Sequence, residues 1–171
     1  MLAPVQSSIE RDPDEVDNPA VATIYRHWKE RAAGRWAPTW RDIDIMMLPP
    51  PLLPYVLVCD VTADNDFIYR YWGRGHTNYH GRDYTQKRLS EMKPDWVRDL
   101  LKHQYMRVLE SREPRAFETR YDGVTQAVYS IRMPLSDDGE ALTGVLGLAD
   151  RASLAQTLAR WVSEQRQDDA S

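Results

Sequence analysis

The sequence predicts an α+β fold: a five-stranded antiparallel sheet with inserted helices on one face and flanking N- and C-terminal helices. Three observations predict it. Amphipathic helical patterns lie near both ends, five strand-like runs lie between them, and a helical region, residues 74–110, separates the second run from the third. Turn residues between consecutive runs indicate hairpins, which make a sheet antiparallel, and the inserted helices then cover one of its faces.

The chain begins with a polar, acidic and aperiodic segment, so we expect a mobile tail over residues 1–17. A helix follows, because Asn18 can cap it and Pro19 fits the first helical position, where a missing N–H costs nothing. Gly34 can supply the left-handed residue that ends this helix. Its apolar stripe is Val21, Ile24, Tyr25, Trp28 and Ala32.

A proline-rich connector links this helix to the sheet. The prolines at 49–51 and 54 exclude a regular helix and a central strand through 49–54. Its apolar side chains predict that the connector packs on the body, with a short helical turn near residues 42–47. These side chains are Trp36, Trp40, Ile43 and Leu52.

The first two strand runs, 55–62 and 66–73, are joined by the turn-forming tetrad ADND and predict a hairpin. Regular alternation places Phe67, Tyr69 and Tyr71 on one face of the second strand. The opposite face then carries Ile68, Arg70 and Trp72. Glycines and Asn78 within residues 73–81 predict short turns.

A second helix runs from Pro94 to about Glu110, and three strand runs, 115–122, 126–136 and 141–151, follow it. Ser153 and Gln156 can form a capping box for a last helix. The inward positions of that helix are Leu154, Leu158, Trp161 and Val162. We therefore expect a single domain over residues 18–163 and a frayed tail over residues 164–171.

Composition narrows the class of protein. A net charge of -4 gives no support to nucleic-acid binding or to an anionic membrane surface. No apolar run approaches the roughly 20 residues that cross a bilayer, and Cys59 alone can form neither an internal disulfide nor a Cys-rich zinc site. The sequence thus predicts a cytoplasmic protein. Its six Trp and nine Tyr, against two Phe, suit pockets and interfaces.

Short motifs follow one another in order along the chain. Trp28 precedes PTWRDIDI (38–45), LLPYVLVCDV (52–61), YRYWG (69–73), GRDYTQKRL (81–89) and MPLSDDGEALTGVLG (133–147). Together these motifs resemble a bacterial family of short, stand-alone PAS-domain proteins, over roughly residues 22–150. Ile45 stands where that family usually has proline, and Gln86 where it often has glycine.

The resemblance implies a PAS-like sensory or interaction module with no catalytic residues. Such domains enclose a small molecule between the sheet and the inserted helices, so we expect a small, largely apolar ligand there. The candidate ligand-binding residues are Tyr71, His76, Tyr79, Trp96, Tyr105 and Tyr129. We expect a homodimer through the terminal helices, with Trp28 and Trp161 either covering one sheet face or meeting a second subunit, and output through a signalling protein partner.

Other chemistries have weaker support. His76 and His80 have the i, i+4 spacing of a zinc pair but no clear third ligand, so no metal is predicted. Haem would need one of these or His103 as axial ligand, and Cys59 lies on a strand rather than in a flavin-reactive helical motif. The cofactor therefore stays unknown. A ligand-free dimeric adaptor and a small-cone isomerase or lyase that uses Tyr71, His76, Tyr79 and Asp83 are the alternatives.

Two arginines on predicted strands could bind an anion. Arg70 or Arg132, if it faces inward, would hold a carboxylate or phosphate with its planar guanidinium. The simpler interpretation pairs each with an acidic residue on an exposed sheet face.

Overall fold

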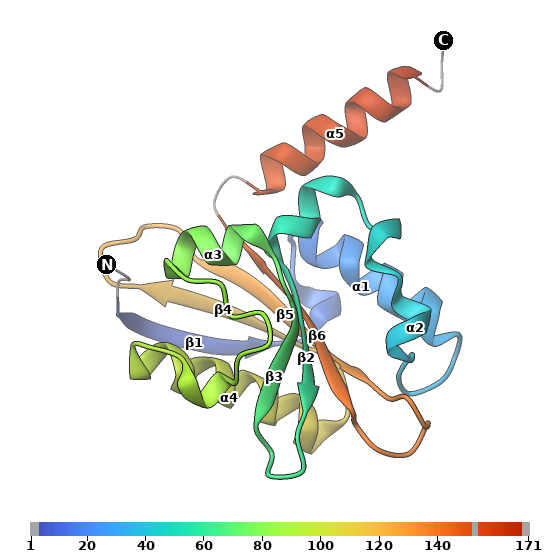
Figure 1. The fold of residues 1–171 in the computed structure, drawn as a ribbon. Coiled ribbons are helices and arrows are strands. Elements are labelled where there is room, and N and C mark those ends of the chain that lie inside the picture. Colours follow the sequence, from blue (N-terminus) through green and yellow to red (C-terminus); the bar gives the residue numbers. More distant parts are fainter. Residues whose placement is uncertain (1–3, 152–153, 169–171) are drawn as a thin grey trace.

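The computed structural model describes residues 4–151 and 154–168 and shows an α+β fold with one open, antiparallel sheet (Figure 1). The sheet has six strands in the order β1-β4-β5-β6-β2-β3. Their bounds are β1 Val5–Arg11, β2 Val56–Val61, β3 Phe67–Trp72, β4 Arg115–Tyr121, β5 Val128–Leu135 and β6 Gly144–Asp150. All five predicted strands are present, and a sixth was not predicted.

The additional strand corrects the prediction of a mobile tail over residues 1–17. Val5–Arg11 form β1, which pairs antiparallel with β4 from Val5 opposite Tyr121 to Arg11 opposite Ala116. The polar sequence VQSSIER has no strong strand pattern of its own, so its structure comes from pairing with a strand more than 100 residues away. Residues Pro13–Glu15 then form a 3-10 turn.

The first face of the sheet is covered by helices from residues 19–55. Helix α1 (Pro19–Ala32) is capped as predicted, because Asn18 Oδ1 accepts a hydrogen bond from the Val21 N–H at 3.0 Å. Helix α2 (Trp40–Ile43) and two 3-10 helices, η2 (Ile45–Met47) and η3 (Pro50–Tyr55), continue the layer. The short helical turn predicted near residues 42–47 is thus divided between α2 and η2, and the proline segment, where a regular helix was excluded, takes the 3-10 form.

This first core takes its sheet side chains from β2, β5 and β6. Trp28 is 6% exposed, and its Nε1–H donates to the Pro134 carbonyl at 2.9 Å. Trp28 therefore covers the sheet and is not free to meet a second subunit. The buried sheet residues here are Val56, Val58, Ile131, Met133, Leu135, Leu146 and Leu148.

The second face is covered by α3 (Arg74–His80), the turn η4 (Leu89–Glu91) and α4 (Asp95–Ser111). Its buried sheet residues are Leu57, Cys59, Phe67, Tyr69, Trp72 and Val145. Both faces of the sheet are therefore buried over β2, β5 and β6, whereas Ile9 on β1 and Arg120 on β4 stay exposed.

A register shift in β3 corrects the predicted alternation. Val58 pairs with Tyr71 and Cys59 with Tyr69, so Arg70 is the extra residue of a β-bulge. After the bulge, each side chain of β3 lies on the face opposite to the one that regular alternation predicts. Tyr69 and Trp72 lie in the second core, whereas Tyr71 packs against the first.

Two glycines let α3 lie directly on η3. A Cβ on Gly73 would come within 2.3 Å of the Pro54 carbonyl oxygen, and one on Gly75 within 2.6 Å of the Tyr55 ring. These glycines were predicted to serve turns, but they permit close packing of a short helix. Gly81, with φ +73°, does end that helix.

Helix α5 (Leu154–Asp168) ends later than predicted, inside the expected tail over 164–171. Trp161 packs partly buried against the first core, and the helix contacts η3 and α1. Figure 1 shows the C-terminal half of α5 standing away from the sheet. The predicted capping box lies outside the described residues, as do the side chains of Leu154, Leu158 and Val162.

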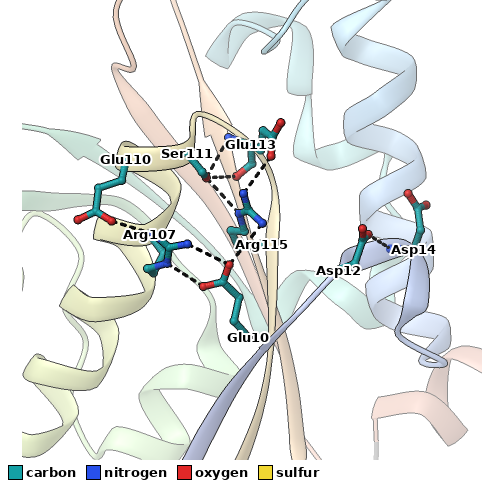
Figure 2. Close-up of polar contacts among 8 residues, drawn as sticks. All are labelled: Glu10, Asp12, Asp14, Arg107, Glu110, Ser111, Glu113 and Arg115. Atoms are coloured by element: carbon teal, nitrogen blue, oxygen red, sulfur yellow. Dashed lines mark hydrogen bonds and ion pairs between the residues drawn. The ribbon is translucent and has the colours of Figure 1, made fainter.

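Charged side chains fasten β1 to α4 and β4. Figure 2 shows the Glu10 carboxylate between two guanidinium groups. Arg107 donates to it through Nε at 2.8 Å and Nη2 at 3.3 Å, and Arg115 Nη1 lies 3.4 Å away. The hydrogen bonds from Arg107 hold the pKa of Glu10 below its usual value. Glu110, by contrast, is exposed and contacts Arg107 alone.

Glu10→Gln should lower the free energy of unfolding by about 0.5–1 kcal/mol, because an amide keeps the shape but loses the charge shared by two arginines. Urea denaturation at low salt measures the change. The matched variant Glu110→Gln should cost much less. Equal losses in the two variants would show that Glu10 has no special role in fastening β1.

Candidate functional site

A small internal cavity lies between the second face of the sheet and the helices α3 and α4. Its volume is about 30 Å³, and each water needs roughly 10–15 Å³ on this measure, so it has room for about two. The wall from α3 and α4 is Tyr79, His80, Trp96, Val97, Leu100, Leu101 and Gln104. The wall from β4 to β6 and just beyond is Thr119, Tyr121, Val128, Ser130, Arg132, Ala149 and Arg151.

Arg132, on β5, is the most unusual residue of this wall. It is only 3% exposed, and its Nε donates to Gln104 Oε1 at 3.1 Å. Its guanidinium lies 5.4 Å from the centre of the Tyr105 ring, as a cation–π contact requires. Nη1 is buried and has no hydrogen-bond partner. A guanidinium in this position has a neutral amide and an aromatic ring beside it, but no carboxylate.

The surrounding strands are built to hold Arg132. Gly147 pairs with it across β5 and β6, and a Cβ at Gly147 would come within 2.6 Å of Nη1. Gln104 is itself held by β1, because its Nε2 donates to Ser8 Oγ at 3.5 Å. Ser8 Oγ lies 3.2 Å from Thr119 Oγ1. The unpredicted strand β1 therefore supports the residue that orients Arg132.

Further donors surround the cavity. The guanidinium of Arg151 lies 3.6 Å from the Tyr79 ring centre, and its Nε is buried without a partner, as is Nδ1 of His80. Among the described residues, neither Arg132 nor Arg151 forms an ion pair. Burial, and then Arg151 and Arg132, lower the pKa of His80 to about 3. Two arginine guanidinium groups thus lie in the wall of the site.

Tyr79 and Trp96 line this cavity as predicted, and two other predicted residues lie near it. Tyr105 is fully buried under Arg132, with its hydroxyl 3.1 Å from that of Tyr69. His76 is 2% exposed, and its Nε2 is 2.7 Å from the Tyr55 carbonyl oxygen, to which the neutral ring donates. Burial lowers the pKa of His76 well below its usual value.

Tyr71 and Tyr129 lie on the other side of the sheet, which corrects the prediction that they face residues 74–110. Both pack against the first core, and the Tyr71 hydroxyl donates to the Leu53 carbonyl at 3.0 Å. The bulge at Arg70 places Tyr71 on the first face of the sheet and not on the second. Tyr129 shares its face with Ile131 and Met133, so the opposite side chains of β5, including Arg132, face the cavity.

The two arginines considered from the sequence have different positions. Arg70 is exposed, its Nε donates to Asp60 at 3.1 Å, and it stacks over Trp40. For Arg70 the simpler interpretation is correct. For Arg132 it is wrong, because the sheet has no exposed face at β5 on which an acidic partner could be solvated.

Within the described residues, the side chains named for the metal and isomerase or lyase hypotheses are not brought together. In the part of the chain that the structure describes, no three His, Cys, Asp or Glu side chains are grouped to hold a metal ion. Cys59 is fully buried, and burial raises the pKa of its thiol. Asp83 is exposed and bonds Thr85 within its own turn, and Tyr71 lies across the sheet from Tyr79.

Sequence reasoning missed Gln104, Ser8, Gly147 and Arg151. For Gln104 a signal was present, because it occupies a position within the apolar stripe of α4, between Leu101 and Val108. A polar residue there needs a buried partner. Ser8, Gly147 and Arg151 carry no such local signal, since their roles come from pairing across the sheet.

Comparison with known proteins supplies no relative: no protein-family model, curated protein or solved structure matches the chain. No helix within residues 4–151 or 154–168 is long and apolar enough to cross a membrane.

The low pKa of His80 predicts loss of stability in mild acid. The unfolded chain takes up a proton on this histidine near pH 6.5, but the folded protein does so only near pH 3, so stability falls as pH drops below about 6.5. His80→Gln should flatten the dependence of unfolding free energy on pH between about pH 7 and 5, measured by urea denaturation. Identical slopes for the variant and the wild type would contradict the prediction.

Proposed function

We propose that the chain is a PAS-like sensory module that binds a small molecule between its sheet and α3 and α4 and signals through a protein partner. One observation carries the proposal: the cavity in this position has the buried guanidinium of Arg132 in its wall, and that guanidinium forms no ion pair among the described residues. Buried charges are normally paired, so an unpaired one in the wall of a cavity indicates a binding position. The order of two strands, inserted helices and three strands supports the PAS-like interpretation.

Direct contacts connect the cavity to the terminal helices. Tyr79 and His80 belong to α3, and α3 packs on η3 through Gly73, Gly75 and the bond from His76 to the Tyr55 carbonyl. In turn, η3 contacts α5, and α5 contacts α1. A ligand that moves α3 would therefore shift η3 and the base of α5. A ligand that binds one arrangement of α3 more tightly than another would then shift the population of the two arrangements.

We place the expected homodimer on α5 in this proposal. Its side chains at Arg160 and at 163–168 are exposed, and Figure 1 shows this part of the helix beyond the body. Trp161 stays at the base of the helix, against the first core. A displacement of η3 would thus change the orientation in which α5 contacts a second copy or another protein.

The alternative is a ligand-free interaction adaptor, and the size of the cavity favours it. Tyr69, Tyr105 and Trp72 fill most of the space beneath α4, and about 30 Å³ remains. Small-molecule pockets usually reach a few hundred Å³. A sensor with this interior must bind a very small molecule or only one end of a larger one.

Native mass spectrometry of protein purified from its own host separates sensor from adaptor. We expect a retained small molecule that is released on denaturation. Ala149→Leu should abolish its retention, because Ala149 lines the cavity and a larger side chain occupies its volume. Ala141→Leu, at an exposed position, is the matched control. Wild-type protein that carries no small molecule would favour the adaptor.

Sedimentation velocity tests the role of α5. The full chain should sediment as a dimer, and a chain that ends at Arg151 should sediment as a monomer that still unfolds cooperatively. A truncated chain that stays dimeric would place the subunit contact elsewhere.

A further inference from the structure

The cavity has two arginines in its wall, and one of them has no acidic partner. Arg132, Arg151 and His80 all line it, and none of the lining residues in the described part of the chain is Asp or Glu. Arg151 interacts electrostatically with the carboxyl of the neighbouring Asp150. Arg132 is 3% exposed and, among the described residues, its one hydrogen bond is to neutral Gln104. A buried cation without a counter-ion is costly, so an anion that enters the cavity beside the Arg132 guanidinium stabilises the site.

The size of the cavity restricts the anion. A volume of about 30 Å³ accepts about two water-sized groups, which is the size of the two oxygens of a carboxylate. A phosphate brings four oxygens and a larger charge. A carboxylate also matches the planar fork of a guanidinium.

The rest of the molecule has a place to extend. A surface hollow beside the cavity is lined by Pro4, Asn78, Tyr79, His80, Gly81, Pro94 and Trp96. Tyr79, His80 and Trp96 line both the hollow and the cavity, so these three side chains form the boundary between them. An aromatic or apolar group would pack there on Trp96 and the two prolines.

We propose that the site binds a small organic monocarboxylic acid, with its carboxylate on the Arg132 guanidinium inside the cavity and its apolar end in the hollow at Trp96. This inference rests on the proposed sensory function and gives its ligand a chemical class. It also refines the expected apolar ligand into a molecule with one charged end. Arg151 supplies a second positive charge, and Gln104 keeps the guanidinium in place.

Sodium benzoate is the probe, with neutral benzamide as its isostere and inorganic phosphate as the larger anion. Isothermal titration calorimetry on the full chain should give benzoate binding at least about tenfold tighter than benzamide, because benzamide has no charge to pair with the guanidinium. Binding should shift the Nε–Hε resonance of Arg132. Phosphate should bind more weakly than benzoate.

Arg132→Met should remove benzoate binding, and the variant should unfold at the same temperature as the wild type or a higher one, because it no longer buries a cation. Arg70→Met is the matched control, since Arg70 is an exposed arginine on a strand, and it should bind normally. If Arg132→Met does not fold, Gly147→Ala tests the same residue, because its methyl group would displace Nη1 of Arg132. This variant should bind benzoate at least about tenfold more weakly than the wild type, and benzamide as the wild type does.

The outcomes separate this inference from the proposed function. A neutral molecule retained by host-purified protein, with no binding of benzoate, overturns the carboxylate assignment and leaves the sensor intact. Phosphate that binds more tightly than benzoate also overturns it. No retained molecule and no binding of any probe overturns both.

Discussion

A guanidinium buried between two layers without a carboxylate is the constraint on which the centre of this protein depends. Arg132 needs a glycine opposite, a polar side chain on α4 to accept from its Nε, and an aromatic ring beside it. Gln104 meets the second need, and its amide donates to Ser8 on β1, which is in turn bonded to Thr119 on β4. Four strands and one helix are thus arranged around a single cation.

Capping residues, turn residues and apolar periodicity predicted helix α1 and five of the six strands. Asn18 and Pro19 start α1 at the expected position, and the five expected strands occur within a few residues of their predicted bounds. Strand β1 could not be predicted, because its polar sequence becomes a strand only beside β4 and through the ion pairs of Glu10. Non-local pairing leaves no periodic pattern in the chain.

The candidate site was harder to predict because alternation presumes that one sheet face meets water. At β5 helices cover both faces, so alternation could not decide whether Tyr129 or Arg132 lines the cavity. The sequence predicted Tyr129, but Arg132 lines it. The bulge at Arg70 then reversed the faces of Tyr71 and Trp72, which no propensity reveals. Tyr79 and Trp96 were found because the segment that carries them must cover the sheet.

Strand β1 is the edge strand of the sheet, and its polar sequence VQSSIER replaces the more apolar edge that β4 would offer. At the opposite end of the sheet, Tyr69 on β3 is already bonded to Gln86 and Lys87. Proteolytic removal of β1 would bare the backbone of Arg115–Tyr121, a seven-residue template that includes Ala116 and Phe117. Such unpaired hydrogen-bonding groups invite strand addition from another chain. A protein without β1 would therefore lose the hydrogen bond from Gln104 to Ser8. The same cleavage would make it prone to aggregation through β4.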